Sequence, residues 1–252
     1  MEIRHTVHGR HVAVLTIDNE PKRNAMSRAM MADLAALWDR LDADTVCRAV
    51  VLTGAGDKGF CAGADIGGDL SASAETARTV NRALLKDVAF TKPIVAAVNG
   101  DCAGGGVELL LSTDIRGADP AARFGLPEVR YAIYPFGGAT VKLIRQIGHV
   151  HAMDLLLTGR LVEAAFAEKI GLVNLVVEPG KVLDWAIGVA ETIARNSPAA
   201  VQAVKQQIAT GIADHVRARE SLEQQLGDRV RASADFAEGV SAFREKRRPH
   251  YP

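Results

Sequence analysis

The segment IVAAVNGDCAGGGVELLLSTDI, residues 94–115, decides the fold of this 252-residue chain. Its first five residues are small or β-branched, which is typical of a strand buried on both faces. An Asn-Gly pair breaks the strand, three glycines at 104–106 form a turn, and an apolar helix follows. Such a turn exposes unpaired backbone N–H groups at the positive end of the helix dipole, where an anionic oxygen is stabilised. Glu108 lies one turn inside this helix, where a carboxylate is costly unless it is used or paired.

A second turn of small residues follows the expected strand at 49–53. It reads KGFCAGADI, residues 58–66. Small residues let the backbone approach a ligand closely. Two turns of this kind can each supply one N–H to the same oxygen, so the pair predicts an oxyanion hole.

Composition excludes several classes of protein. Lysine plus arginine and aspartate plus glutamate each number 30, so the net charge is zero and nothing attracts nucleic acid over a long range. The hydrophobic fraction of 48% is enough for a sizeable core. The N-terminus has no apolar signal core, and no apolar run approaches membrane-spanning length.

The cysteines, Cys47, Cys61 and Cys102, are odd in number and without a CxxC pair. This spacing predicts neither a disulfide framework nor a thiolate zinc site. We expect reduced thiols in a cytoplasmic protein, and no metal.

Strands and helices alternate over roughly the first 180 residues, and only helices follow, which predicts an α/β fold with a helical tail. Ser27 is expected to cap a helix that buries Met30, Leu34, Leu37, Trp38 and Leu41. The other expected helices span residues 75–90, 137–147, 149–157, 163–170, 182–195, 198–210, 217–231 and 235–247, and strands are expected at 11–17, 48–53 and 172–177, with short ones at 115 and 123–124.

Two blocks of the sequence, GFCAGADI and NGDCAGGGVELLLSTDI, resemble the signature motifs of the crotonase (enoyl-CoA hydratase/isomerase) superfamily. Further matches, in the family's order, are PKRNAM at 21–26, FGLPE at 124–128, LTGR at 157–160 and AFREKR at 242–247. The resemblance covers nearly the whole chain. It implies a spiral of ββα units in residues 1–195 and a C-terminal helical oligomerisation region in residues 196–252. It also implies a homotrimer, or a hexamer made of two trimers.

The resemblance implies that the chain is an enoyl-CoA hydratase, as in fatty acid β-oxidation. Syn addition of water to a conjugated thioester needs a base for the water and an acid for the α-carbon, and two carboxylates with separated pKa values can do both. By its place in the motifs Glu108 activates water and Glu128 delivers the α-proton. Taken without the resemblance, Glu128 is better explained as a surface glutamate before a turn, and for Glu108 too the residues alone favour a structural role.

The resemblance assigns the remaining site residues by position. The oxyanion hole is assigned to the N–H groups of Ala62 and Gly105. Coenzyme A, which enters as part of the substrate with no separate cofactor, is assigned to Arg23, Ala25, Ala62, Ala64, Asp65, Ile66, Gly105, Phe243 and Lys246. For the segment around Lys246, a solvated basic tail is an equally good reading.

One position departs from the hydratase pattern. Hydratases usually have PGAGG after the catalytic glutamate, whereas this chain has Pro135-Phe136-Gly137-Gly138-Ala139. We therefore expect Tyr131, Tyr134, Pro135 and Phe136 to line the acyl pocket, with Phe136 narrowing it or moving the catalytic water. Two alternatives stay open. One is another reaction through the same enolate, either isomerisation or dehydration of a specialised hydroxyacyl-CoA, and the other is a silent acyl-CoA-binding protein.

Overall fold

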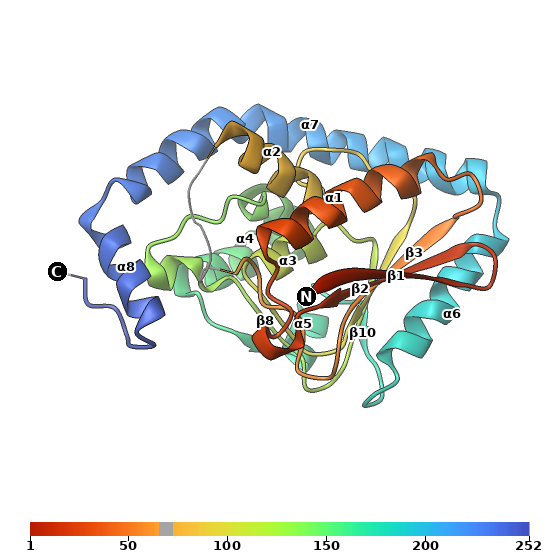
Figure 1. Ribbon diagram of the computed structural model, residues 1–252, viewed down its shortest axis with the longest axis horizontal. Coiled ribbons are helices and arrows are strands. Elements are labelled where there is room, and N and C mark those ends of the chain that lie inside the picture. Colours follow the sequence, from red (N-terminus) through yellow and green to blue (C-terminus); the bar gives the residue numbers. More distant parts are fainter. Residues whose placement is uncertain (66–72, 252) are drawn as a thin grey trace.

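The computed structural model describes residues 1–65 and 73–251, and its centre is a six-stranded sheet (Figure 1). The first two strands pair antiparallel, and the other neighbouring strands run parallel. Every residue of the two central strands is buried, because helices cover both faces of the sheet. In sheet order the strands are β1 (Glu2–His8), β2 (Val12–Asp18), β3 (Ala49–Gly54), β5 (Ile94–Val98), β7 (Ile115–Ala118) and β10 (Leu175–Val176).

A second sheet contains four short strands. They are β4 (Gly59–Cys61), β6 (Asp101–Ala103), β8 (Arg123–Gly125) and β9 (Val162–Glu163), in that order. The chain passes three times from the large sheet to the small one, through β3–β4, β5–β6 and β7–β8, and a helix follows each pair. This repeat is the expected spiral of ββα units, and the α/β prediction is confirmed.

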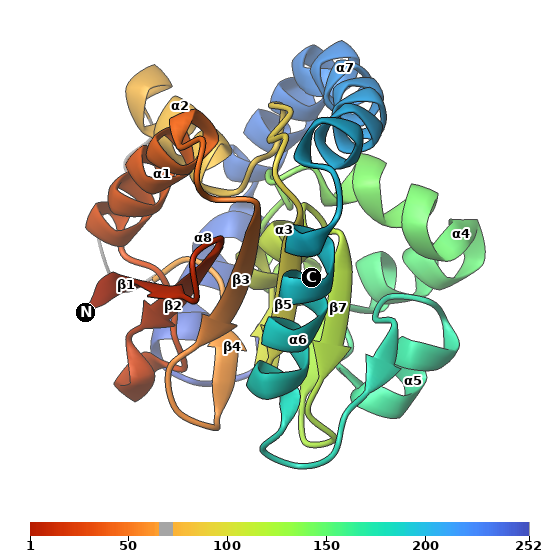
Figure 2. The same ribbon diagram turned by 90° about the vertical axis from the view of Figure 1, so that its right-hand side faces the viewer.

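Helices surround the two sheets. α6 lies across one face of the large sheet, α1 lies on the other, and α7 crosses one end of the molecule (Figures 1 and 2). Their bounds are α1 (Arg28–Ala43), α2 (Ala74–Ala83), α3 (Gly105–Leu110), α4 (Ala139–Thr158), α5 (Ala164–Lys169), α6 (Val182–Arg195), α7 (Pro198–Arg231) and α8 (Ala234–Arg244), with short 3-10 helices η1 (Glu20–Lys22) and η2 (Pro127–Tyr131). None of the described helices is long and apolar enough to cross a membrane.

The first helix follows the prediction closely. The Ser27 hydroxyl accepts a hydrogen bond from the Met30 N–H at 3.3 Å, which caps α1. All five predicted core residues of the helix are buried. Ser27 thus fixes where α1 begins, and its apolar face fixes how it packs.

Two helix predictions were wrong in extent. The expected helices at 198–210 and 217–231 form one continuous helix, α7, because no atom crowds Gly211 and a helix tolerates a single glycine. The helix expected at 75–90 ends at Ala83, and Leu85 has a left-handed φ of 48°. Its carbonyl accepts a hydrogen bond from Lys142 Nζ at 2.8 Å, which stabilises a turn in place of another helical turn.

Candidate active site

Glu108 projects from the short helix α3 into the protein interior. It is 5% exposed, and the Gly137 N–H donates a hydrogen bond to its Oε1 at 2.6 Å. Burial raises the Glu108 pKa to about 7, and the Glu223 charge adds to the rise while the N–H groups of Gly137 and Ala139 oppose it. A carboxyl group with this pKa can both accept and release a proton near neutral pH.

Glu128 approaches the same region from η2. A methyl group on Gly104, the residue before α3, would lie 3.0 Å from Glu128 Oε1. Burial raises the Glu128 pKa to about 8, and the Glu108 charge contributes to this rise. Within the described residues, Glu128 Oε2 is buried without a hydrogen-bond partner. The two acids predicted from the sequence therefore lie close enough for their charges to interact, and one buried oxygen is left unpaired beside the start of α3.

The start of α3 carries the first candidate oxyanion donor. Among the backbone hydrogen bonds of the described residues, none uses the Gly105 N–H, as expected for the first residue of a helix. A methyl group on Gly105 would lie 3.6 Å from the Ala64 nitrogen. The second turn therefore brings Ala64, rather than Ala62, beside Gly105.

The prediction that Ala62 supplies the second oxyanion donor is contradicted, because the backbone N–H of Ala62 already donates a hydrogen bond within the protein. The Ala62 N–H donates to the Arg23 carbonyl at 3.1 Å and is therefore already used. Two residues further on, Ala64 forms an isolated parallel bridge with Met26. The bonds of that bridge run from Met26 N–H to the Gly63 carbonyl (2.8 Å) and from Asp65 N–H to the Met26 carbonyl (2.9 Å), so they leave the Ala64 N–H unengaged.

The same bridge brings together most of the residues assigned to coenzyme A. It aligns the segment from Arg23 to Met26 with the segment from Ala62 to Asp65, and Lys22 pairs with Asp65 at 2.6 Å. Ile66 lies outside the described residues. A partly exposed edge of paired basic and acidic side chains thus runs along the second turn.

Asp101 and Arg123 belong to this edge and were missed at the level of sequence. Asp101 accepts hydrogen bonds from Arg23 at 2.6 Å and from Arg123 at 2.9 and 2.7 Å. The Arg23 side chain remains 57% exposed. The available signal was the Asn-Gly break, because the residue after it begins β6, an inner strand of the second sheet.

The aromatic residues assigned to the acyl pocket pack against the C-terminal helices. The Tyr131 ring meets Phe243 of α8 edge to face, with centroids 5.1 Å apart. Tyr134 and Phe136 pack together at 5.3 Å, and the Phe136 ring lies against Gly227 of α7. The expected narrowing of the acyl pocket by Phe136 therefore has no support in this packing. Lys246 follows the end of α8 in a left-handed conformation, with its N–H bonded to the Phe243 carbonyl at 3.2 Å.

The described residues were searched for clusters of metal-binding side chains and for reactive cysteines. Those residues contain no group of three histidine, cysteine or acidic side chains suited to a metal ion. Cys47, Cys61 and Cys102 are free and buried, and burial raises the pKa of the Cys61 thiol to about 12. The cysteines therefore pack as small apolar residues.

Comparisons with known proteins show the family of this chain. The family model described as enoyl-CoA hydratase/isomerase matches residues 8–252. Enoyl-CoA hydratase EchA19 of Mycobacterium tuberculosis is 40% identical over 248 residues, covering 96% of this chain and 93% of that protein. The 2,3-dehydroadipyl-CoA hydratase of Escherichia coli is 37% identical over 244 residues, covering 95% of this chain and 94% of that protein. The crystal structure of carnitinyl-CoA hydratase from Mycobacterium avium superposes with a TM-score of 0.90 at 35% identity, covering 99% of this chain and 97% of that one. The chain therefore belongs to the enoyl-CoA hydratase/isomerase family, the crotonase superfamily to which its two glycine-containing motifs point.

Proposed function

We propose that this protein is an enoyl-CoA hydratase that adds water across the double bond of a trans-2-enoyl-CoA. The observation that carries the proposal is the pair of buried carboxyl groups, Glu108 and Glu128, at the start of α3. Their pKa values of about 7 and 8 let one group be ionised while the other keeps its proton near neutral pH. Relatives named as hydratases at 37–40% identity support the same reaction.

The pKa order suits the two roles. Glu108, with the lower value, accepts a proton from water as the water oxygen forms a bond to the β-carbon. Electrons of the double bond move toward the thioester carbonyl and give an enolate. Glu128, with the higher value, then donates its proton to the α-carbon. The product is the 3-hydroxyacyl thioester. The pair of acids holds one proton before the reaction, two while the enolate exists and one again after the α-carbon is protonated.

The enolate oxygen is proposed to bind between the N–H groups of Gly105 and Ala64. Losing one such donor typically raises a barrier by about 3–4 kcal/mol. Gly105 adds the positive end of α3 to this interaction. Coenzyme A is proposed to follow the edge formed by Arg23, Ala25, Ala64 and Asp65, and Lys246 remains a candidate contact.

A direct assay tests the proposal. Purified protein is mixed with a short trans-2-enoyl-CoA, and the absorbance of the conjugated thioester is followed, with Glu128→Gln in parallel. We expect rapid loss in the wild type and a rate about 10²–10⁴-fold lower in the variant. Glu168→Gln, which alters an exposed glutamate on α5, is the matched control and is expected to behave as wild type.

The alternatives give different results in the same assay. Isomerisation incorporates no oxygen from heavy-oxygen water, whereas hydration incorporates one atom per product. A silent binding protein gives a calorimetric signal with acyl-CoA and no turnover. If Glu128→Gln hydrates the substrate as fast as the wild type, Glu128 is not the proton donor of the mechanism.

Assembly and location are also proposals. We propose that residues 196–252 form the oligomerisation region of a homotrimer, or of a hexamer of two trimers. Two large apolar side chains of this region are exposed, Leu222 of α7 (48%) and Phe243 of α8 (39%), which supports its burial in an assembly. Three free cysteines support a reducing cytoplasmic location.

A further inference from the structure

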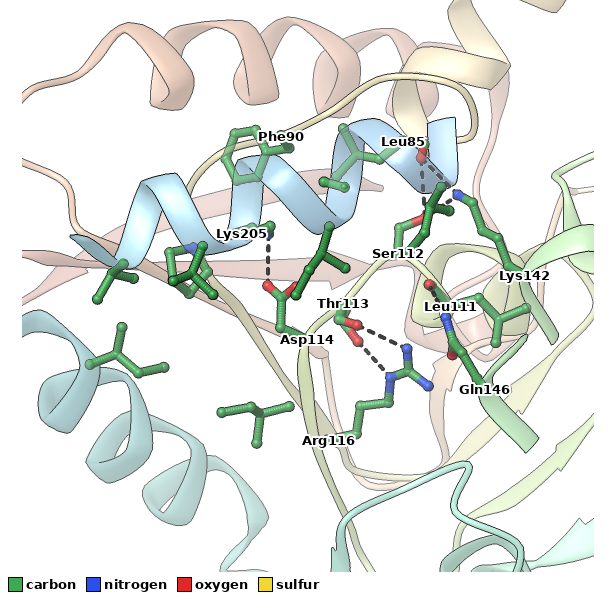
Figure 3. A pocket seen from close by; sticks show the side chains of 18 of the residues that line it. Leu85, Phe90, Leu111, Ser112, Thr113, Asp114, Arg116, Lys142, Gln146 and Lys205 are labelled. Atoms are coloured by element: carbon green, nitrogen blue, oxygen red, sulfur yellow. Dashed lines mark hydrogen bonds and ion pairs between the residues drawn. The ribbon is translucent and has the colours of Figure 1, made fainter. Parts of the chain in front are cut away.

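A second cavity lies beyond the far end of α3, between that helix and the first half of α7 (Figure 3). Its volume is about 880 Å³, within the range of small-molecule sites. Leu111 and Ser112 line it, and Glu108 lies three residues before Leu111, about 5 Å along the helix axis at 1.5 Å per residue. Neither Glu108 nor Glu128 is among the residues that line the cavity.

The cavity wall is largely aliphatic. α7 supplies one side, and the turn before β5 and the strand β7 supply much of the other. The apolar lining residues include Leu85, Phe90, Ile115, Leu172, Val201 and Ile208. A wall of this kind binds a hydrocarbon chain through burial of apolar surface.

Two buried basic side chains also line the cavity, Lys142 from α4 and Arg116 from β7 (Figure 3). They are 3% and 6% exposed. Burial lowers the pKa of Arg116 to about 10, so its guanidinium stays charged near neutral pH. Burial lowers the pKa of Lys142 to about 7, and a bound carboxylate would favour its charged form.

Lys142 Nζ donates to the Leu85 carbonyl at 2.8 Å and to Ser112 Oγ at 2.9 Å, which uses two of its three N–H groups. Arg116 donates to Thr113 and to the Leu172 carbonyl at 2.9–3.1 Å, which uses three of five. Both cations therefore keep unused donors.

No carboxylate of the described residues makes an ion pair with either of these cations. The other charged groups in the wall are already paired, Lys205 with Asp114 at 2.7 Å and Lys86 with Glu223. The groups that act on Lys142 from a distance are Glu108, Asp87, Lys86 and Arg116. Asp114, which is paired with Lys205, acts on Arg116 from a distance. A buried cation without a counter-ion is costly, and a bound anion removes that cost.

We propose that this cavity binds an aliphatic monocarboxylate, with the carboxylate facing Lys142 and Arg116 and the hydrocarbon chain lying along α7. Charge complementarity selects the carboxylate head, and the aliphatic wall selects the tail. This site differs from the catalytic one in that it recognises a free acid and no thioester. The proposal does not depend on the hydratase assignment.

Titration calorimetry of the full-length protein with octanoate tests the proposal. We expect one octanoate per chain, with octan-1-ol bound at least about tenfold more weakly, since a hydrogen bond to a charged group typically contributes that much. Octylammonium, which has the same tail and the opposite charge, is expected not to bind. Equal binding of all three compounds would overturn the role of the two cations.

Two variants locate the site. Ala209→Phe fills the cavity from α7, whereas Ala203→Phe places the same side chain on an exposed position of α7 that does not line it. The first is expected to abolish octanoate binding and the second to leave it unchanged. Lys142→Met, which keeps the length of the side chain without its charge, is expected to weaken octanoate binding about tenfold or more and to leave octanol binding unchanged.

A competition experiment separates the cavity from the acyl-CoA site. Octanoate is titrated into protein saturated with a non-hydrolysable short acyl-CoA analogue, and we expect its affinity to stay within about twofold of that of the free protein. Displacement by the analogue would overturn the proposal, because the cavity would then be the end of the acyl-chain site. The proposal would also be overturned if neither the wild type nor any variant bound octanoate, with or without the analogue. Coverage of the cavity by a second copy of the chain would give that result.

Discussion

The ring of Phe136 occupies the space that a side chain on Gly227 would need. A methyl group built on Gly227 would overlap Phe136 Cζ, and the Arg231 guanidinium lies 4.5 Å from the ring centroid. The residue after Phe136 is Gly137, whose N–H holds the Glu108 carboxylate. Phe136 thus attaches the loop that orients Glu108 to the C-terminal helix α7.

This attachment predicts that Phe136→Gly loses both stability and activity. Removing a packed phenylalanine ring costs about 3–5 kcal/mol, which is roughly 6–20 °C in Tm for a chain of this size. We expect kcat to fall about tenfold, because the Gly137 hydrogen bond to Glu108 loses its support. Thermal unfolding and the hydration assay measure the two effects.

The exchange variant Phe136→Gly/Gly227→Phe is the control. It returns one ring to the same space from the other side and is expected to recover at least half of the lost Tm. If Phe136→Gly has the Tm and kcat of the wild type, the attachment has no functional consequence.

Much of this site could be predicted from sequence, but the direction of Phe136 could not. The family motifs identified Glu108 and Glu128 by position, and the glycine turn before Glu108 added a physical reason to expect a functional acid there. The side on which Phe136 packs depends on the missing side chain of Gly227, 91 residues further along the chain. The Ala62 assignment failed for a similar reason, since the bridge between Met26 and Ala64 decides which N–H is free.

The Gly137 position predicts a second variant. A methyl group on Gly137 would overlap the Glu108 carboxyl group, so Gly137→Ala must displace the proposed base. We expect kcat to fall about 10²-fold, because misplacement of a reacting group by about 1 Å has that effect. Gly188→Ala on α6 is the matched control, since no atom lies within 4 Å of the new methyl group. It is expected to keep full activity and to gain about 0.5–1 kcal/mol of stability.

If Gly137→Ala were as active as Gly188→Ala, the reaction would tolerate displacement of the Glu108 carboxyl group.

The two raised pKa values predict a bell-shaped pH dependence of kcat/KM. Below about pH 7 Glu108 becomes protonated and can no longer act as the base. Above about pH 8 Glu128 loses the proton that it donates. The rate is therefore expected to be highest between these values, with both limits belonging to the pair as a whole. A rate that stays constant from pH 5 to 10 would contradict a mechanism with one shared proton.

The same burial predicts that Glu128 destabilises the folded protein at alkaline pH. Its folded pKa of about 8 exceeds the ordinary value of 4.5, so the folded state binds more protons than the unfolded state between these values. The free energy of unfolding therefore falls as pH rises through this window. Glu128→Gln removes the effect, and we expect it to be about 2–4 kcal/mol more stable than the wild type at pH 9 and nearly equal to it at pH 4. Urea unfolding at both pH values measures the difference. If Glu128→Gln changed the free energy of unfolding equally at both pH values, the gain in stability would not come from the ionisation of Glu128.

The Lys86–Glu223 ion pair predicts how firmly α7 is held beside Glu108. The two side chains are 3% and 5% exposed, and the Lys86 ammonium donates to Glu223 Oε1. Lys86→Met leaves the Glu223 carboxylate buried without its partner, which typically costs about 3–5 kcal/mol. Lys86→Met/Glu223→Leu leaves no buried charge, and we expect it to recover most of that loss. The control is Asp214→Asn, which breaks the exposed pair with Arg217 and is expected to change stability by less than about 1 kcal/mol. Urea unfolding is measured for the wild type, Lys86→Met, Glu223→Leu and the double variant, with Asp214→Asn as the control. The first four proteins form a double-mutant cycle, which gives the coupling energy between Lys86 and Glu223. The double variant could instead lose as much free energy of unfolding as the two single variants lose together. That result would show that the two side chains stabilise α7 through packing alone and that the charge of Lys86 has no part in it.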